Sequence, residues 1–143
     1  MFLGTFTNNL DTKNRLSLPK KIAALLSGTI VVSKGFDGCL ELRTYESFQS
    51  YSDKLMNLSQ NKKNTRIIQR QLLANAAMID VDSNNRILLP INLLKEANIT
   101  KSLVLIGVGT KLEIWDSELY SSFKESTDAT YEKLAEELED ENF

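Results

Sequence analysis

Short segments rich in β-branched and apolar residues alternate with turn-forming residues in the first half of the chain. This pattern predicts four strands, over residues 5–10, 15–18, 29–34 and 39–43. Turns are expected at 11–14 and 35–38, where Asp, Asn and Gly gather. A short helix is predicted over 20–27, because Pro19 suits the first helical position and Gly28 suits the end.

Two longer helices are predicted to follow these strands. Thr44 is a suitable N-cap for the first, and its apolar residues recur at steps of three and four: Phe48, Tyr51, Leu55 and Leu58. The second helix is predicted over 61–77, with one apolar face formed by Ile68, Leu72 and Ala76. Basic residues crowd the first part of this second helix: Lys62, Lys63, Arg66 and Arg70.

The second half of the chain repeats the same order of elements. Strands are predicted at 78–81 and 86–89, a helix at Pro90, and a hairpin over 102–115. Asp116 then caps a final helix whose apolar stripe is formed by Leu119, Phe123, Tyr131, Leu134 and Leu138. We expect the aromatic and leucine stripes of 44–58 and 116–138 to lie mostly in the core, with contacts between subunits as the alternative.

One polar pattern occurs twice, as DTKNRLSLP from Asp11 to Pro19 and as DSNNRILLP from Asp82 to Pro90. The two copies lie 71 positions apart, so the chain is interpreted as a tandem duplication. We predict a first module with its helix at 1–59, a connecting helix at 60–77, and a second module with an acidic C-terminal helix at 78–143. The chain has no linker rich in Pro, Gly or Ser, so the two modules are expected to pack together.

The repeated pattern is typical of a stiff loop that presents an arginine. Asp11 and Asp82 are expected to shape their loops by accepting backbone N–H bonds. Asn14 and Asn85 precede the arginines, and Asn tolerates the left-handed backbone that such turns need. Each arginine then projects a fork that can bind two phosphate oxygens or a guanine edge. The alternative is a local Asp–Arg ion pair, which contributes less than about 1 kcal/mol when exposed.

Charge is unevenly distributed along the chain, although its net value is only −2. Residues 1–115 carry 15 basic and nine acidic side chains, whereas residues 116–143 carry two basic and ten acidic ones. Only the body is therefore a candidate for binding a polyanion such as DNA. The acidic segment is interpreted first as a solvated helix face and tail.

Several other kinds of function are disfavoured by the composition. The chain has no His and one Cys, so zinc-finger ligands and His-based catalytic triads are not available. Cys39 is expected to be a small core residue. Gly107, Gly109 and Lys111 lie between two predicted strands and lack the spacing of a phosphate-binding loop, so they are predicted to form a hairpin turn. We expect no enzyme activity, cofactor, metal or small-molecule substrate.

The apolar segments also indicate where in the cell the protein is expected. No apolar run, including Leu103 to Ile106, is longer than five residues, which is far too short to span a bilayer. The first residues lack the pattern of a secretory signal. We therefore expect a cytoplasmic protein without a membrane partner.

The duplicated pattern, the opening MFLGT and the LEIWD segment from Leu112 to Asp116 together resemble the MraZ family. This resemblance covers the chain up to about residue 125. It implies an α+β fold in which two AbrB-like, swapped-hairpin β-α-β modules form a pseudo-two-fold, β-barrel-like body with flanking helices. It also implies a sequence-specific, DNA-binding transcriptional regulator that acts on tandem promoter repeats near division and cell-wall genes, associates with the nucleoid, and assembles with itself into a ring.

The resemblance also assigns roles to the repeated loops. The implied DNA contacts are Thr12, Lys13 and Arg15 in the first loop and Ser83, Asn84 and Arg86 in the second. The family usually has Gly before each arginine, whereas this chain has Asn14 and Asn85. Since Asn shares access to the left-handed region with Gly, we expect the same turn here. Lys20 and Lys21, at the following helix, are additional candidates.

Two other functions remain as alternatives. The apolar helix stripes are compatible with a structural assembly or protein-interaction oligomer. The AbrB-like fold is also compatible with an antitoxin that binds a toxin through its C-terminal part, although such antitoxins usually carry one module. Only a DNA regulator is expected to bind DNA specifically and to lose affinity steeply between about 50 and 200 mM salt.

Overall fold

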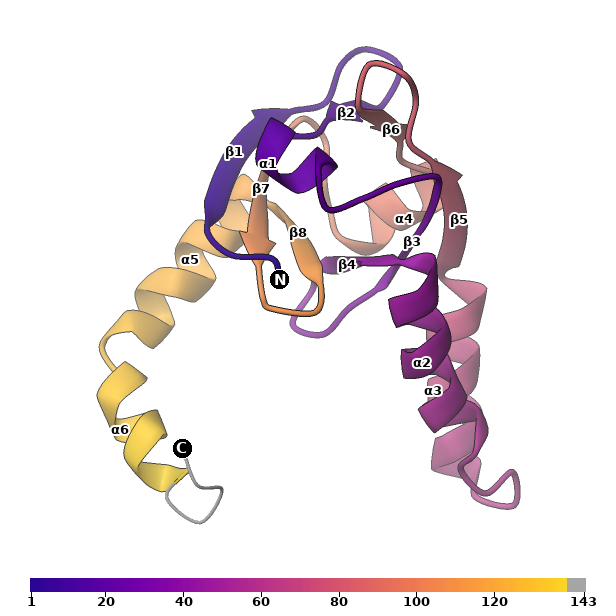
Figure 1. Cartoon of the computed structure of the whole chain (residues 1–143). Helices are drawn as coiled ribbons and strands as arrows, with labels where there is room; N and C mark the ends of the chain where they lie inside the picture. Colours follow the sequence, from indigo (N-terminus) through magenta and orange to yellow (C-terminus); the bar gives the residue numbers. More distant parts are fainter. Residues whose placement is uncertain (139–143) are drawn as a thin grey trace.

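Each half of the chain forms the same succession of elements in the computed structural model, which describes residues 1–138 (Figure 1). The first half contains β1 (Thr5–Asn9), β2 (Arg15–Ser17), α1 (Lys20–Ala23), β3 (Thr29–Lys34), β4 (Leu40–Thr44) and α2 (Tyr45–Met56). After the connecting helix α3 (Lys63–Ala74), the second half contains β5 (Ala76–Asp80), β6 (Arg86–Leu88), α4 (Ile91–Glu96), β7 (Ser102–Gly107), β8 (Leu112–Asp116), α5 (Ser117–Asp128) and α6 (Tyr131–Glu137). The predicted α+β fold class is confirmed.

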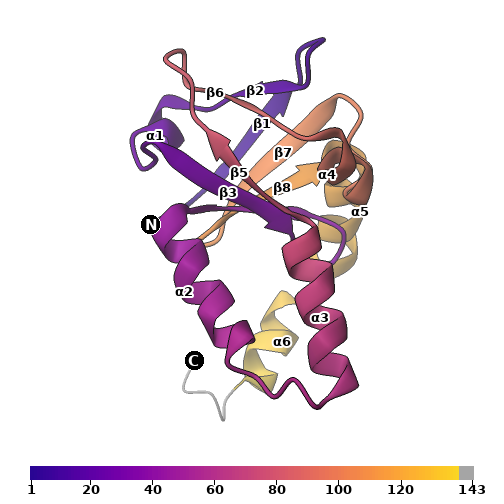
Figure 2. The ribbon, with the colours of Figure 1, turned by 90° about the vertical axis from the view of Figure 1, so that its right-hand side faces the viewer.

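The two halves exchange strands with each other. Six strands form one antiparallel sheet in the order β1-β7-β8-β4-β3-β5. Strand β1 of the first half therefore pairs with β7 of the second, while β5 of the second half pairs with β3 of the first. Strands β2 and β6 form a separate two-stranded ribbon that lies over the top of the curved sheet, between its two edge strands (Figures 1 and 2). The result is a barrel-like body in which neither half is independent.

The strand registers reveal a pseudo-two-fold axis through this body. In the ribbon, Leu16 lies opposite Ile87, its counterpart in the other half. In the sheet, Glu41 lies opposite Glu113, which is also its counterpart. A residue can pair with its own counterpart only where a two-fold axis passes between them, so the axis runs through both pairs. The duplicated loops that precede β2 and β6 are thus related by this axis.

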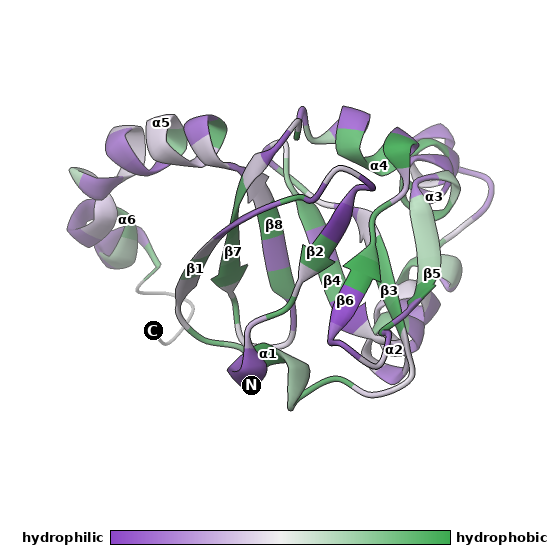
Figure 3. Cartoon of the chain, turned by 90° about the horizontal axis from the view of Figure 1, so that it is seen from above, coloured by the Kyte–Doolittle hydropathy of each residue, from purple (hydrophilic) through white to green (hydrophobic). Residues whose placement is uncertain are grey.

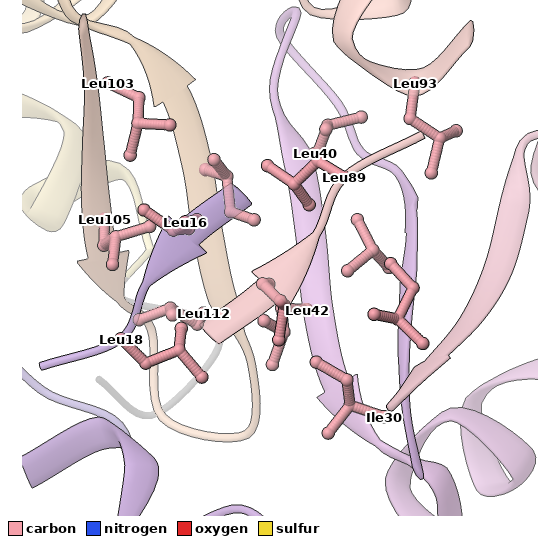
Figure 4. Packing of buried hydrophobic residues seen from close by; sticks show 14 of the residues in the cluster. Leu16, Leu18, Ile30, Leu40, Leu42, Leu89, Leu93, Leu103, Leu105 and Leu112 are labelled. Atoms are coloured by element: carbon pink, nitrogen blue, oxygen red, sulfur yellow. The ribbon is translucent and has the colours of Figure 1, made fainter. Parts of the chain in front are cut away.

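The core lies between the ribbon and the inner face of the sheet (Figure 4). Alternate strand residues point inward, including Leu40 and Leu42 of β4 and Leu103 and Leu105 of β7, all fully buried. Leu16 from the ribbon packs into the same cluster. The ribbon is therefore fixed to the sheet by its inward side chains, and its outward side chains remain available.

The outer face of the sheet contains a buried polar group near the axis. The Glu41 carboxylate, 1% exposed, accepts hydrogen bonds from Arg43 Nη1 at 2.8 Å and from Lys111 Nζ at 2.6 Å. The Arg43 guanidinium also stacks on Tyr51 of α2, 3.8 Å from the ring centroid. At the position equivalent to Arg43, Trp115 packs against Tyr120 and Phe123 of α5. Corresponding contacts thus attach the helix of each half to the sheet.

The bounds of several helices differ from the sequence prediction. Helix α3 ends at Ala74 instead of residue 77, because Asn75 leaves the helical conformation and Ala76 and Ala77 pair with β3. Helix α1 ends at Ala23 instead of residue 27. The single helix predicted after Asp116 is two helices, separated around residues 129–130. In the first case, the hydrogen-bonding edge of a distant strand outweighs local helix propensity.

The prediction that the helical apolar stripes lie mostly in the core is wrong. Within residues 1–138, helices α2, α5 and α6 contain no buried residue. The physical reason is visible in Figure 1, where the helices extend away from the sheet as two arms, one formed by α2 and α3 and the other by α5 and α6. Helices α2 and α5 contact the sheet in their first two turns, as Tyr51 and Phe123 do. Farther along the arms, Leu58, Tyr131, Leu134 and Leu138 stay about half exposed or more.

Candidate nucleic-acid interface

The two repeated loops lie together at one end of the molecule, opposite the helical arms (Figure 1). Seen from above, the ribbon formed by β2 and β6 crosses this end, and each loop leads into one of its strands (Figure 3). The ribbon ladder continues beyond the strands, because Leu89 N donates to Asn14 O and Leu18 N donates to Asn85 O. Asn14 and Asn85 therefore lie at opposite ends of the ribbon. The distance between these ends is four residues along one strand, from Asn14 to Leu18, or about 13 Å.

In the first loop, one carboxylate organises the backbone. Asp11 Oδ1 accepts hydrogen bonds from the backbone N–H of Lys13 at 2.8 Å and of Arg15 at 2.9 Å. The backbone N–H of Asn14 donates to Asp11 O at 3.1 Å, and that of Asp11 donates to Arg15 O at 3.0 Å. These four bonds close the loop around the aspartate.

The second loop repeats this geometry closely. Asp82 Oδ1 accepts from the backbone N–H of Asn84 at 2.8 Å and of Arg86 at 2.9 Å. Asn85 N donates to Asp82 O and Asp82 N donates to Arg86 O, both at 3.0 Å. The φ angles of Asn14 and Asn85 are 60° and 58°, in the left-handed region that the sequence predicts. The two loops therefore have the same shape because the Asp and the Asn that determine it are identical in the two copies.

Each arginine forms an ion pair with the aspartate of its own loop. Arg15 Nε donates to Asp11 Oδ2 at 2.8 Å, and Arg86 Nε donates to Asp82 Oδ2 at 3.1 Å. An arginine has five N–H donors, and four of them are on Nη1 and Nη2. Among residues 1–138, these terminal nitrogens have no hydrogen-bond acceptor in either loop. The ion pair thus orients the guanidinium and leaves its terminal edge free for a ligand.

The same contacts hold the aspartates ionised. The backbone N–H of Arg15 is the largest cause that lowers the pKa of Asp11 from 3.8 to about 2, with further contributions from the Arg15 side chain and the backbone of Lys13. The pKa of Asp82 is lowered in the same way, chiefly by the backbone N–H of Arg86. Both loops therefore keep their carboxylates charged, and their arginines oriented, at neutral pH.

The outward face of the ribbon brings residues of both halves together. Arg15 lies opposite Leu88, and Arg86 lies opposite Ser17. Because directly opposite residues point to the same side of a ribbon, each arginine has a neighbour contributed by the other half. The sequence prediction did not include this pairing. The sequence feature that could have indicated the pairing is the short amphipathic strand after each loop. Such a strand needs a hydrogen-bonding partner, and here the partner is the equivalent strand of the other half.

The remaining predicted contact residues lie in the loops before the ribbon strands and in the helix α1 that follows β2. Thr12 and Lys13 are exposed in the first loop, and Ser83 and Asn84 are exposed in the second. Lys20 and Lys21, in the first turn of α1, are exposed as well. The arrangement collects cationic and hydrogen-bonding side chains on one end of the body, with two fixed guanidinium groups among them. A polyanion is the ligand class that such a surface favours.

A second cluster, of side chains that could bind a metal ion, lies on the sheet, and its acidic members already have cationic partners. Cys39, Glu41 and Glu113 lie close enough together for a metal ion. Burial is the main cause that raises the pKa of the Cys39 thiol to about 12, which keeps it protonated. Lys111 and Arg43 already pair with Glu41, so this cluster is interpreted as a structural ion-pair network.

The described part of the chain, residues 1–138, holds no helix with the length and hydrophobicity needed to cross a membrane.

Comparison with known proteins finds one family along the whole chain. The family model described as "MraZ protein, putative antitoxin-like" matches twice, over residues 1–71 and 72–143. A protein of Mycoplasmoides gallisepticum named "Transcriptional regulator MraZ" is 42% identical over 142 residues, which cover 99% of this chain and 100% of that protein. A protein of the same name from Mesoplasma florum is 42% identical over 139 residues, which cover 96% of this chain and 95% of that protein.

Proposed function

This chain belongs to the MraZ family, and from that premise we propose that it is a sequence-specific DNA-binding transcriptional regulator. The observation that carries the proposal is the pair of matching loops, each with an arginine whose Nε is held by an aspartate and whose terminal nitrogens have no acceptor within residues 1–138. The names of the two relatives agree with this role.

The ribbon fits the geometry of a DNA groove. The major groove is about 12 Å wide and admits a two-stranded β-ribbon. The β2–β6 ribbon is anchored by its inward leucine and isoleucine side chains and exposes its outward face, so it can enter a groove without unfolding the body. The two loops, about 13 Å apart along the ribbon, then reach the DNA on either side of the pseudo-two-fold axis.

The roles of the loop residues follow from their chemistry. The terminal nitrogens of Arg15 and Arg86 bind guanine O6 and N7 or two phosphate oxygens. Lys13 adds a phosphate contact, and Asn84 adds an amide that suits an adenine edge. The hydroxyls of Thr12 and Ser83 donate to phosphates. Asp11, Asp82, Asn14 and Asn85 shape the loops and do not touch the DNA.

We propose that the targets are tandem promoter repeats near division and cell-wall genes, as the family implies. The protein would then act in the cytoplasm, associated with the nucleoid. Because residues 1–138 of a subunit form a single two-stranded ribbon, high affinity for tandem repeats requires several linked subunits, each of which raises the effective concentration of the next.

Self-association is supported by an apolar groove on one helical arm. The groove has a volume of about 560 Å³, lies between α2 and α3, and is lined chiefly by Phe36, Tyr51, Leu55, Leu58, Ile68 and Leu72. Lys34 and Lys54 also line it, and basic residues crowd the start of α3. The other arm, formed by α5 and α6, carries exposed Tyr131, Leu134 and Leu138 among acidic residues.

We therefore propose that the acidic arm of one subunit docks in the basic-rimmed groove of the next. The two surfaces differ, so the contact is head-to-tail, and repetition gives a closed ring or an open filament. The family resemblance favours the ring.

Footprinting of the region upstream of the chain's own coding sequence tests the DNA-binding proposal. We expect protected segments that recur about every helical turn, roughly 10 bp, where subunits bind one face of the duplex. The Arg15→Ala/Arg86→Ala variant should leave the same region unprotected while its circular dichroism spectrum is unchanged. Absence of protection by the wild-type protein, on this region and on duplexes from a random-sequence library, would refute the proposed function.

A further inference from the structure

The pseudo-two-fold axis relates backbones, but the side chains that it relates differ on the outward face of the ribbon. On the ribbon, Ser17 of the first half corresponds to Leu88 of the second. In the helices that follow, Lys20 of α1 corresponds to Ile91 of α4. Leu88 is 57% exposed and Ile91 is 59% exposed. One half of the proposed DNA-binding face is therefore polar where the other half is apolar.

The exposure of Leu88 is not explained by the core. Its neighbours in the sequence, Ile87 and Leu89, point inward and are 0% and 1% exposed. Leu88 alternates with them and points outward, directly opposite Arg15 across the ribbon. Their Cβ atoms are then about 5 Å apart on the same face. A large aliphatic side chain thus lies directly across the ribbon from Arg15, whereas Ser17 lies directly across from Arg86.

We propose that Leu88 is a specificity-determining residue that contacts the 5-methyl group of a thymine next to the base or phosphate bound by Arg15. This inference rests on the proposed DNA-binding function. In the major groove, the 5-methyl group of thymine is the apolar feature that an aliphatic side chain can read. It protrudes from the edge of the base, and a leucine exposed on the ribbon is suited to cover it. Ser17, at the equivalent position beside Arg86, has no comparable apolar surface.

The inference predicts that the two half-sites read by one subunit are chemically different. The half-site next to Arg15 includes a 5-methylpyrimidine, whereas the one next to Arg86 has no such requirement. The backbone symmetry alone would favour a palindromic site. The Leu88 contact instead favours an asymmetric DNA site and fixes the orientation of the subunit on it.

Uracil-containing DNA provides a direct test, because uracil lacks only the 5-methyl group and keeps the hydrogen-bonding edge of thymine. Duplexes are first enriched from a random-sequence library by the wild-type protein and then synthesised with thymine or with uracil throughout. The dissociation constants of both forms are measured for the wild type, for Leu88→Ser and for Ser17→Leu. Leu88→Ser copies the residue of the other half, and its exposed position makes it a mild change for the fold.

For the wild type, we expect uracil substitution to weaken binding about fourfold per contacted methyl group, as expected from the transfer free energy of one buried methylene. Leu88→Ser should bind the two forms equally, and its affinity for the thymine form should match that of the wild type for the uracil form. Ser17→Leu should become more sensitive to uracil than the wild type.

The outcomes separate this inference from the function on which it rests. If the wild type binds both forms equally, or if Leu88→Ser keeps the wild-type ratio, the Leu88 contact is refuted while DNA binding stands. If the wild type enriches no duplex from the library, the proposed function itself fails.

Discussion

Asp, Asn and Arg each perform a separate task in the repeated loops. The aspartate accepts two backbone N–H groups and an arginine Nε, the asparagine supplies the left-handed turn, and the arginine presents its terminal nitrogens. Sequence reasoning predicted the backbone contacts and the positive φ, because both depend on residues within four positions of each other. It treated the Asp–Arg ion pair as an alternative to ligand binding, whereas the geometry makes the two compatible.

The low pKa of Asp11 leads to a prediction about pH. Its folded pKa of about 2 lies below the ordinary value of 3.8, so its contribution to stability is fully present above pH 4 and is lost as the pH falls towards 2. Carbon-13 NMR titration of the Asp11 carboxyl group should give a midpoint near 2. The Arg15→Ala variant should keep a depressed value, since the backbone N–H of Arg15 is the largest cause. A midpoint near 3.8 in the wild type would show that the loop is not closed in solution.

At the scale of elements, local patterns predicted the order of strands and helices but not where helices end or what they cover. The connecting helix stops at Ala74 because β3 offers a pairing edge to Ala76 and Ala77, which no local pattern reveals. The stripes of α2 and α5 were assigned to the core because periodicity identifies an apolar face and not its partner. Caps were more predictable, since Thr44 and Asp116 both accept a backbone N–H from the first turn of their helices.

The Asp116 cap allows a test at this scale. Its side chain accepts from Leu119 N at 3.1 Å, at the start of the helix that packs on Trp115. Asp116→Ala should lower the free energy of unfolding by about 1 kcal/mol. Urea denaturation followed by the fluorescence of Trp115, the only tryptophan, measures this change. Asp116→Asn, which keeps a capping oxygen, should remain close to the wild type, and an equal loss in both variants would argue against the cap.

At the scale of the molecule, duplication produces one body with two unlike arms. The sequence revealed the repeat, but the exchange of strands between the halves depends on pairings of residues far apart in the chain. Strand β1 pairs with β7 about a hundred residues away, and β5 pairs with β3 about fifty residues away, and only the assembled sheet displays these pairings. The axis brings two loops to one end and places the helical arms at the other (Figure 1). The surfaces proposed for DNA binding and for self-association therefore lie at different ends of the body, and we expect mutations to separate the two.

This separation predicts the behaviour of arm variants. Tyr131→Glu/Leu134→Glu places two charges on the apolar stripe of α6 and should shift the protein to smaller species in sedimentation velocity experiments, because burying an unpaired charge is costly. Affinity for a duplex with one site should stay within about threefold of the wild type, whereas tandem sites should lose their avidity. Lys124→Ala/Lys133→Ala, on the same arm, should assemble normally. An unchanged oligomer distribution in the Glu variant would exclude this arm from the contact.

The central claim is that Arg15 and Arg86 themselves bind DNA, and a charge-matched comparison of affinities tests it most directly. Dissociation constants on the chain's own upstream duplex are measured at one salt concentration for the wild type, Arg15→Ala/Arg86→Ala and Lys124→Ala/Lys133→Ala. Both variants lose two positive charges, but only the first changes the loops. We predict at least about a 30-fold loss for the loop variant, from 1–3 kcal/mol for each bidentate contact, and less than about threefold for the arm variant. Equal affinities in the two variants would contradict the account.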